Sequence, residues 1–241
     1  MVIDFPLEFP FESFVCQQER AMTLKVYMAG PDVFLPNALE LAKDKKAIMR
    51  AHGFEGLHPF DNEVNTVGLT PYQIGIKIFE ANMEMMKSAD LVIAHITPFR
   101  SPSADVGTAF EMGVMCTLGK PVYAYSNVTP AYIERVAALG GELRTNEHGR
   151  PVDCNGMSIE DFDMIDNLML EGAWRRAGAK VVLVPTTETE RFTSLAGFER
   201  QAANMARELL NRDYVFAPLP DLEQLPTALE AGQRRVAGLQ P

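Results

Sequence analysis

Short runs of consecutive apolar residues alternate with longer amphipathic stretches along most of the chain. Each run is bounded by glycine, proline or a polar loop, which is typical of strands buried on both faces of a parallel sheet. Five such runs occur, at residues 24–29, 54–58, 91–96, 121–125 and 181–184. The second of them is the weakest, because it is short and contains polar positions.

In the amphipathic stretches, apolar residues recur every three or four positions, which predicts helices. Glycines directly after several of these stretches supply the expected helix ends. The predicted helices cover residues 36–52, 71–87, 106–118, 130–139, 162–173 and 195–210. A polar stretch with repeated turn signals, residues 144–156, predicts a loop or a hairpin.

Strands that alternate with helices predict an α/β fold: a doubly wound, flavodoxin-like or Rossmann-like, mostly parallel five-stranded sheet flanked by helices. We expect one domain over residues 23–212. Residues 1–22 lack a clear period and are expected to be an N-terminal extension, disordered or packed on a partner subunit. Residues 213–241, rich in proline and glycine, are expected to form a C-terminal tail outside the domain.

Composition narrows the classes of partner. Hydrophobic residues make up 47% of the chain and charged residues 22%, as in ordinary globular proteins. The formal net charge of -10 disfavours a nucleic acid polymer as a partner, because phosphate backbones are repelled. A small nucleoside or base carries little or no charge and is not excluded.

The cysteines and histidines indicate no metal site and no disulfide framework. Cys16, Cys116 and Cys154 are odd in number, and their spacings fit neither arrangement. A reducing, cytoplasmic location is therefore expected. No apolar run reaches the roughly 20 residues that span a bilayer, and the N-terminus does not resemble a signal peptide.

Three segments are candidates for a ligand site, since the ligands of such sheets bind beyond the carboxyl ends of the strands. The first segment runs from Tyr27 through Gly30, at the end of the first strand, but neither a dinucleotide fingerprint nor a Walker A sequence follows. Asp105 is placed to cap a helix in which Glu111 lies among small and apolar residues. Such a carboxylate is either exposed to solvent or retained for chemistry, and both interpretations stay open. Asn167 lies in a third segment, which by itself is typical of a capped helix start.

Taken together, the motifs resemble the nucleoside 2-deoxyribosyltransferase family, most closely its protozoan-type and related bacterial branch. The DVGTAFEMG segment followed by GKPV is the most specific. The matching segments are VYMAGPDVF (26–34), HPFDNE (58–63), ANMEMMKSADLVIAHITPFR (81–100), DVGTAFEMG (105–113), GKPV (119–122) and DNLML (166–170).

The resemblance implies a role for each matching residue. Glu111 corresponds to the nucleophile, and Tyr27 to the tyrosine that orients it. Asp105 corresponds to the carboxylate that binds the sugar 5'-hydroxyl. Asn167 and Met169 correspond to residues that a neighbouring subunit offers to the sugar, so the resemblance implies a homo-oligomer. The resemblance also implies that nucleosides and bases are the substrates and that no cofactor is needed.

One position departs from the family pattern. Asn82 stands where some members carry an aspartate near the base, and an amide cannot act as a general acid at neutral pH. Asp61 is a nearby candidate for contact with the base. Two rival functions remain: a deoxynucleoside 5'-monophosphate N-glycosidase, and a non-catalytic nucleotide-binding module. Asp105 disfavours the first, since a carboxylate there would repel a phosphate.

Overall fold

The computed structural model describes residues 23–210 except 142, 177, 178 and 180. The extension at residues 1–22 and the tail expected at 213–241 lie outside the described residues. Five parallel strands form one sheet in the order β2-β1-β3-β4-β7. The strands are β1 (Lys25–Ala29), β2 (Glu55–Leu57), β3 (Leu91–His95), β4 (Val122–Ser126) and β7 (Val182–Leu183).

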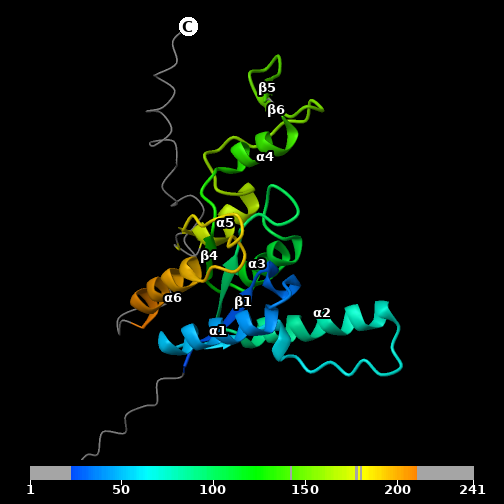
Figure 1. Ribbon diagram of the computed structural model, residues 1–241, viewed down its shortest axis with the longest axis vertical. Coiled ribbons are helices and arrows are strands. Elements are labelled where there is room, and N and C mark those ends of the chain that lie inside the picture. Colours follow the sequence, from blue (N-terminus) through cyan, green and yellow to red (C-terminus); the bar gives the residue numbers. More distant parts are fainter. Residues whose placement is uncertain (1–22, 142, 177–178, 180, 211–241) are drawn as a thin grey trace, which may run out of the picture.

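The helices cover both faces of this sheet (Figure 1). They are α1 (Ala38–Ala51), α2 (Pro71–Ser88), α3 (Val106–Thr117), α4 (Tyr132–Gly140), α5 (Leu168–Arg176) and α6 (Ala196–Leu209), with short 3-10 turns η1 (Pro31–Phe34) and η2 (Pro59–Asp61). α1 contacts α6, whereas α3 contacts α2 on one side and α5 on the other. Right-handed crossovers place these two groups on opposite faces. The predicted doubly wound fold is confirmed.

The central strands carry the core. Every residue of β3 and β4 is buried, as expected for strands covered on both faces. The order of strands reverses between β1 and β3, and in doubly wound sheets the ligand site lies beyond the carboxyl ends of the strands at such a point.

α2 extends beyond the sheet (Figure 1). Thr70 caps it through a capping box with Gln73, and Pro71 occupies its first turn, so the chain itself specifies where the helix begins. Its first three turns expose large apolar side chains, among them Tyr72 and Phe79. In the isolated chain this end of α2 therefore lacks the packing that the rest of the helix receives.

The polar stretch after α4 forms a two-stranded hairpin of β5 (Arg144–Thr145) and β6 (Pro151–Val152), one of the two predicted alternatives. The helix predicted over residues 162–173 is wrong in its first part, because α5 begins only at Leu168. Asp163 has a left-handed backbone with a φ of 55°, and Asp166 directs its carboxylate toward other loops. The Glu160 carboxylate accepts the Leu168 N–H and so marks the start of the helix.

Candidate active site

The central feature of the site is a contact between β1 and α3. Tyr27 lies in the middle of β1 and is fully buried. Its hydroxyl donates a hydrogen bond of 2.5 Å to Oε1 of Glu111, although 84 residues separate the two in the chain. A phenol and a carboxylate at this distance form a strong, charge-assisted hydrogen bond that fixes the orientation of the carboxylate.

The surroundings of Glu111 raise its pKa to about 7. Burial is the largest cause, since it disfavours the charged carboxylate. The hydrogen bond from Tyr27 acts in the opposite direction, and the negative charge of Asp105 adds to the increase. The pKa of Tyr27 is itself raised far above its ordinary value, by burial and by Glu111, so the phenol keeps its proton.

Asp105 caps α3 as its position in the sequence predicts. Its Oδ2 accepts hydrogen bonds from the backbone N–H groups of Gly107, at 3.0 Å, and Thr108, at 3.1 Å. Asp105 ends the loop that links β3 to α3, and Glu111 follows six residues later on α3. The negative charge of Asp105 acts on Glu111, so the two carboxylates lie near each other at the switch point of the sheet.

Gly30 is required for close packing and not for an unusual backbone angle. A Cβ atom there would lie 2.8 Å from Cβ of His95 and 3.0 Å from Oδ2 of Asp32. Its φ of 163° is extended. The side chain of His95, at the end of β3, thus lies close to Gly30. The absence of a side chain at Gly30 allows the loop after β1 to pack against β3.

Asp61 and Asn82 lie at the carboxyl end of β2. Both carboxylate oxygens of Asp61 are engaged, one by Lys46 Nζ at 2.6 Å and the other by the backbone N–H of His58 at 2.9 Å. Asn82 projects from α2 and accepts a hydrogen bond of 2.8 Å from Nδ2 of Asn62. A pair of neutral amides thus occupies the position where some family members carry an aspartate.

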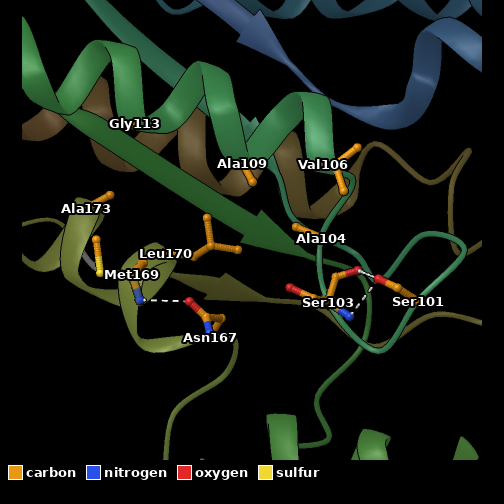
Figure 2. A pocket seen from close by; sticks show the side chains of 10 residues that line it. All are labelled: Ser101, Ser103, Ala104, Val106, Ala109, Gly113, Asn167, Met169, Leu170 and Ala173. Atoms are coloured by element: carbon orange, nitrogen blue, oxygen red, sulfur yellow. Dashed lines mark hydrogen bonds between the residues drawn. The ribbon is translucent and has the colours of Figure 1, made fainter.

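Asn167 and Met169 line a groove of about 410 Å³ between α3 and α5 (Figure 2). Oδ1 of Asn167 accepts the N–H of Met169 at 3.0 Å, and its Nδ2 donates to Glu160 at 2.8 Å. The wall that α3 contributes to the groove includes Ala109 and Gly113.

This groove and Glu111 lie on opposite sides of α3. Ala109 and Gly113 are each two residues from Glu111, which places them about 160° away around the helix. Glu111 faces Tyr27 on β1, whereas Asn167 faces the side of α3 toward α5. The structure therefore brings Tyr27, Asp105 and Glu111 together and leaves Asn167 and Met169 of the same chain apart from them.

Comparison with known proteins identifies the family. The family model for nucleoside 2-deoxyribosyltransferase matches residues 26–169, which include every candidate residue named above. The chain belongs to the nucleoside 2-deoxyribosyltransferase family. The resemblance to this family, inferred from the sequence motifs, is confirmed.

The chain is also similar to individual proteins, one of which has a solved deoxyribosyltransferase structure. An uncharacterized protein of Schizosaccharomyces pombe is 32% identical over 169 residues, which cover 66% of this chain and 80% of the relative. The structure of a 2-desoxiribosyltransferase from Leishmania mexicana is 27% identical and has a TM-score of 0.52, with 77% of this chain and 99% of that chain covered. A CMP N-glycosidase from Clostridium botulinum is 11% identical with a TM-score of 0.38, over 76% and 98% of the two chains, which is too distant to bear on the reaction.

A buried polar network behind the site was not foreseen from the sequence. Asp32, in the turn after β1, forms an ion pair with Lys45 of α1 and a 2.8 Å hydrogen bond with Nδ1 of His95. Nε2 of His95 bonds Thr97 at 2.8 Å, and Thr97 accepts the N–H of Asn127 at 2.9 Å. The network ties together the carboxyl ends of β1, β3 and β4.

The charges of this network follow from their environment. Burial alone would raise the pKa of Asp32, but the Lys45 ammonium and His95 hold it well below its ordinary range. Burial lowers the pKa of His95, which is therefore neutral at pH 7. A neutral His95 donates from Nδ1 to Asp32 and accepts from the Thr97 hydroxyl at Nε2. Lys45 is 2% exposed, and its partner 13 residues earlier compensates its charge.

A second network joins the segment of Asn167 to the segment of Asp105. Asp166 is 1% exposed, and it accepts hydrogen bonds from the hydroxyl of Ser103 and from the backbone N–H of Ala104. Arg135 donates to the same carboxylate at 3.1 Å and to the carbonyl of Pro102 at 2.6 Å. The loop before α3 and the start of α5 therefore form one fixed unit.

The part of the chain that the structure describes contains no cluster of three or more His, Cys, Asp or Glu side chains able to hold a metal ion. Over the same residues, none of the helices combines the length and the apolar character that crossing a bilayer requires.

Proposed function

We propose that the protein transfers the 2-deoxyribosyl group from a 2'-deoxynucleoside to a free purine or pyrimidine base, through a covalent intermediate on Glu111. Membership of the family supports an enzyme of the deoxyribosyltransferase or N-glycosidase type. The observation that carries the finer proposal is the 2.5 Å hydrogen bond between Tyr27 and Glu111, which orients a partly buried carboxylate at the switch point of the sheet.

In the proposed reaction, a carboxylate oxygen of Glu111 attacks C1' while the C1'–N bond to the base breaks. The transition state resembles an oxocarbenium ion, which a nearby carboxylate stabilises. A second base then attacks C1' of the glycosyl ester and releases Glu111, so that two displacements give net retention and ping-pong kinetics. Tyr27 keeps its proton and acts by holding Glu111.

Asp105 is proposed to accept the 5'-hydroxyl of the sugar. Its Oδ2 is engaged in the helix cap, whereas no hydrogen bond within the described residues engages Oδ1. A free hydroxyl suits this acceptor, whereas a 5'-phosphate would place negative charge beside it in a poorly solvated site. We therefore expect the nucleoside and not its monophosphate to be the substrate.

Asn167 and Met169 are proposed to complete the site of a second subunit. Within one chain they lie on the far side of α3 from Glu111. In such a dimer, the start of α5 in each subunit would reach the site of the other subunit. This arrangement would agree with the family pattern and with the positions of these residues in one chain. The proposed active unit is thus a homo-oligomer, and we further propose that it functions in the cytoplasm without a cofactor.

One assay separates transfer from its alternatives. The protein is incubated with deoxyinosine or thymidine and free adenine, and the products are separated. Deoxyadenosine is the expected product, and Glu111→Gln should form none while remaining folded. Free deoxyribose as the main product would indicate a hydrolase. A binding module would yield neither, and no glycosyl adduct on Glu111 would be found by intact mass.

The contribution across subunits has its own test. Glu111→Gln and Asn167→Ala are each expected to be nearly inactive. After mixing and subunit exchange, a heterodimer contains one site with both intact residues if Asn167 acts in trans. Random exchange then restores about a quarter of the sites of the wild-type protein. If Asn167 acts within its own chain, every mixed site keeps one defect and no activity returns.

A further inference from the structure

The amide pair of Asn62 and Asn82 has no place yet in the proposed reaction. Asn62 directly follows η2, and Asn82 projects from the middle of α2. Nδ2 of Asn62 donates to Oδ1 of Asn82 at 2.8 Å. The acceptor oxygen of Asn82 is thus occupied. Among the described residues, its Nδ2 finds no protein acceptor, so it can donate to a ligand.

The pair borders the space beside Glu111. Phe79 lies one turn before Asn82 on the same face of α2, and its ring centroid is 6.0 Å from that of Phe110, the neighbour of Glu111. α2 contacts both β1 and α3, the two elements that hold Tyr27 and Glu111. A nucleoside with its sugar between Asp105 and Glu111 would therefore extend its base toward this part of α2.

The carboxylate, imidazole and phenol around this position have no proton to pass to the base, and the Lys46 ammonium donates to Asp61. Both oxygens of Asp61 are engaged, by Lys46 and by a backbone N–H. His58 is buried, burial lowers its pKa to about 4, and its Nδ1 accepts the N–H of Phe60, so it is neutral at pH 7 and has no proton at that atom. The hydroxyl proton of Tyr27 is donated to Glu111.

We propose that the base leaves as its anion, with Asn82 donating an N–H to a carbonyl or ring-nitrogen acceptor of the base and no side chain protonating it. This inference rests on the proposed function. The C1'–N bond breaks with its electron pair on the base nitrogen, while the Glu111 carboxylate bonds to C1'. The base anion then takes a proton from water. In the second half, an acceptor base that has lost its proton to water attacks C1', and the carboxylate leaves.

The substrate class follows from this chemistry. Bases with acidic ring N–H groups carry the negative charge best, since it spreads onto carbonyl oxygens that an amide donor stabilises. The preferred substrates are therefore deoxynucleosides of 6-oxopurines and 2,4-dioxopyrimidines. Deoxycytidine, whose base is a much weaker acid, should react slowly. Asn82 thus sets specificity through the electronic character of the base and not through its size.

The test uses deoxyuridines substituted at position 5 with hydrogen, methyl, fluorine or bromine, which change the acidity of the ring N–H more than they change shape. Release of the base is measured by absorbance in a single turnover with enzyme in excess, so that product release does not enter. For the wild-type protein, the rate should rise roughly three- to tenfold for each unit by which the pKa of the base falls.

Two variants of Asn82 and one control variant test whether Asn82 causes this dependence on the pKa of the base. Asn82→Asp supplies a carboxylic acid, so it should flatten this dependence and accelerate deoxycytidine relative to deoxyuridine. Asn65→Asp adds the same charge on the exposed loop before α2 and should retain the wild-type slope. Asn82→Ala, which only removes the donor, should slow all four substrates about tenfold or more and keep the slope.

The outcomes separate this inference from the proposed function. If the glycosyl adduct forms but wild-type rates agree within twofold across the series, anionic departure is overturned while transfer stands. If Asn82→Ala reacts like the wild type, Asn82 does not contact the base and the inference is overturned as well. If no nucleoside yields an adduct on Glu111, the proposed function itself fails.

Discussion

Replacing Tyr27 by Phe tests how the site controls its carboxylate. The variant keeps the buried ring in the core and removes only the hydroxyl that donates to Glu111. A hydrogen bond to a charged group contributes about 1.5–3 kcal/mol, and one pKa unit corresponds to about 1.4 kcal/mol. The pKa of Glu111, about 7 in the wild type, should therefore rise by about one to two units.

The sign of the effect on activity follows directly. The ionised carboxylate is the proposed nucleophile, so the rate of adduct formation should rise with pH through the pKa of Glu111. At pH 7 the ionised fraction would fall from about a half to roughly 1–10%, which predicts a decrease of about five- to fiftyfold. At roughly pH 9 to 10 the variant should recover much of this loss.

The assay is the single-turnover rate of base release, measured from roughly pH 5.5 to 10. Tyr123→Phe is a matched control, because it removes a buried tyrosine hydroxyl that bonds Glu208 at 3.1 Å, away from Glu111. It should leave the profile unchanged. A Tyr27→Phe profile that superimposes on the wild type would refute the argument that Tyr27 lowers the pKa of Glu111.

Three further variants test the electrostatics of the same region. Because burial raises the pKa of Glu111 from 4.5 to about 7, the wild type loses stability as pH rises through that interval. The free energy of unfolding of Glu111→Gln, relative to that of the wild type, should therefore increase by about 2–3 kcal/mol from roughly pH 4.5 to pH 8. Urea unfolding at these two pH values measures this difference, which would be absent if the carboxylate were well solvated. Asp105→Asn retains the helix cap but removes the charge, so KM for deoxynucleosides should rise while turnover of the 5'-monophosphate improves; unchanged selectivity would contradict its place at the 5' end. Asp166→Asn leaves the charge of Arg135 uncompensated and should cost about 3 kcal/mol in denaturant unfolding, whereas a change below about 0.5 kcal/mol would mean that the buried pair contributes little.

The pattern of apolar positions predicted most of the fold because each central strand is buried along its whole length. β3 and β4 were placed within one residue of their observed bounds for this reason. The start of α5 was misplaced because partners distant in the chain decide it. Asp166 bonds the loop at Ser103 and Ala104, and no local period reveals that contact.

The resemblance nominated the candidate residues and one contact between them, but not the buried network behind them. It implied that Tyr27 orients Glu111, and the fold brings the two side chains to 2.5 Å. The burial of Lys45 could not be read from the sequence, since its spacing in α1 fits an exposed position equally well. Burial of the Lys45 ammonium is possible only because the Asp32 carboxylate compensates its charge. That ion pair depends on how the turn after β1 packs.

The position of Asn167 gives the strongest reason to regard one chain as an incomplete site. A helix presents its residues in fixed directions, so no local rearrangement can turn Ala109 and Glu111 toward the same ligand. Around the groove, the side chains of Val106 and Met169 are 83% and 74% exposed, which is unfavourable for apolar groups of this size. A second copy that covers them would bury this surface and bring its own Asn167 to the Glu111 side. We therefore infer that assembly and completion of the site are one event, so that dilution below the dissociation constant of the dimer should abolish activity before it unfolds the chain.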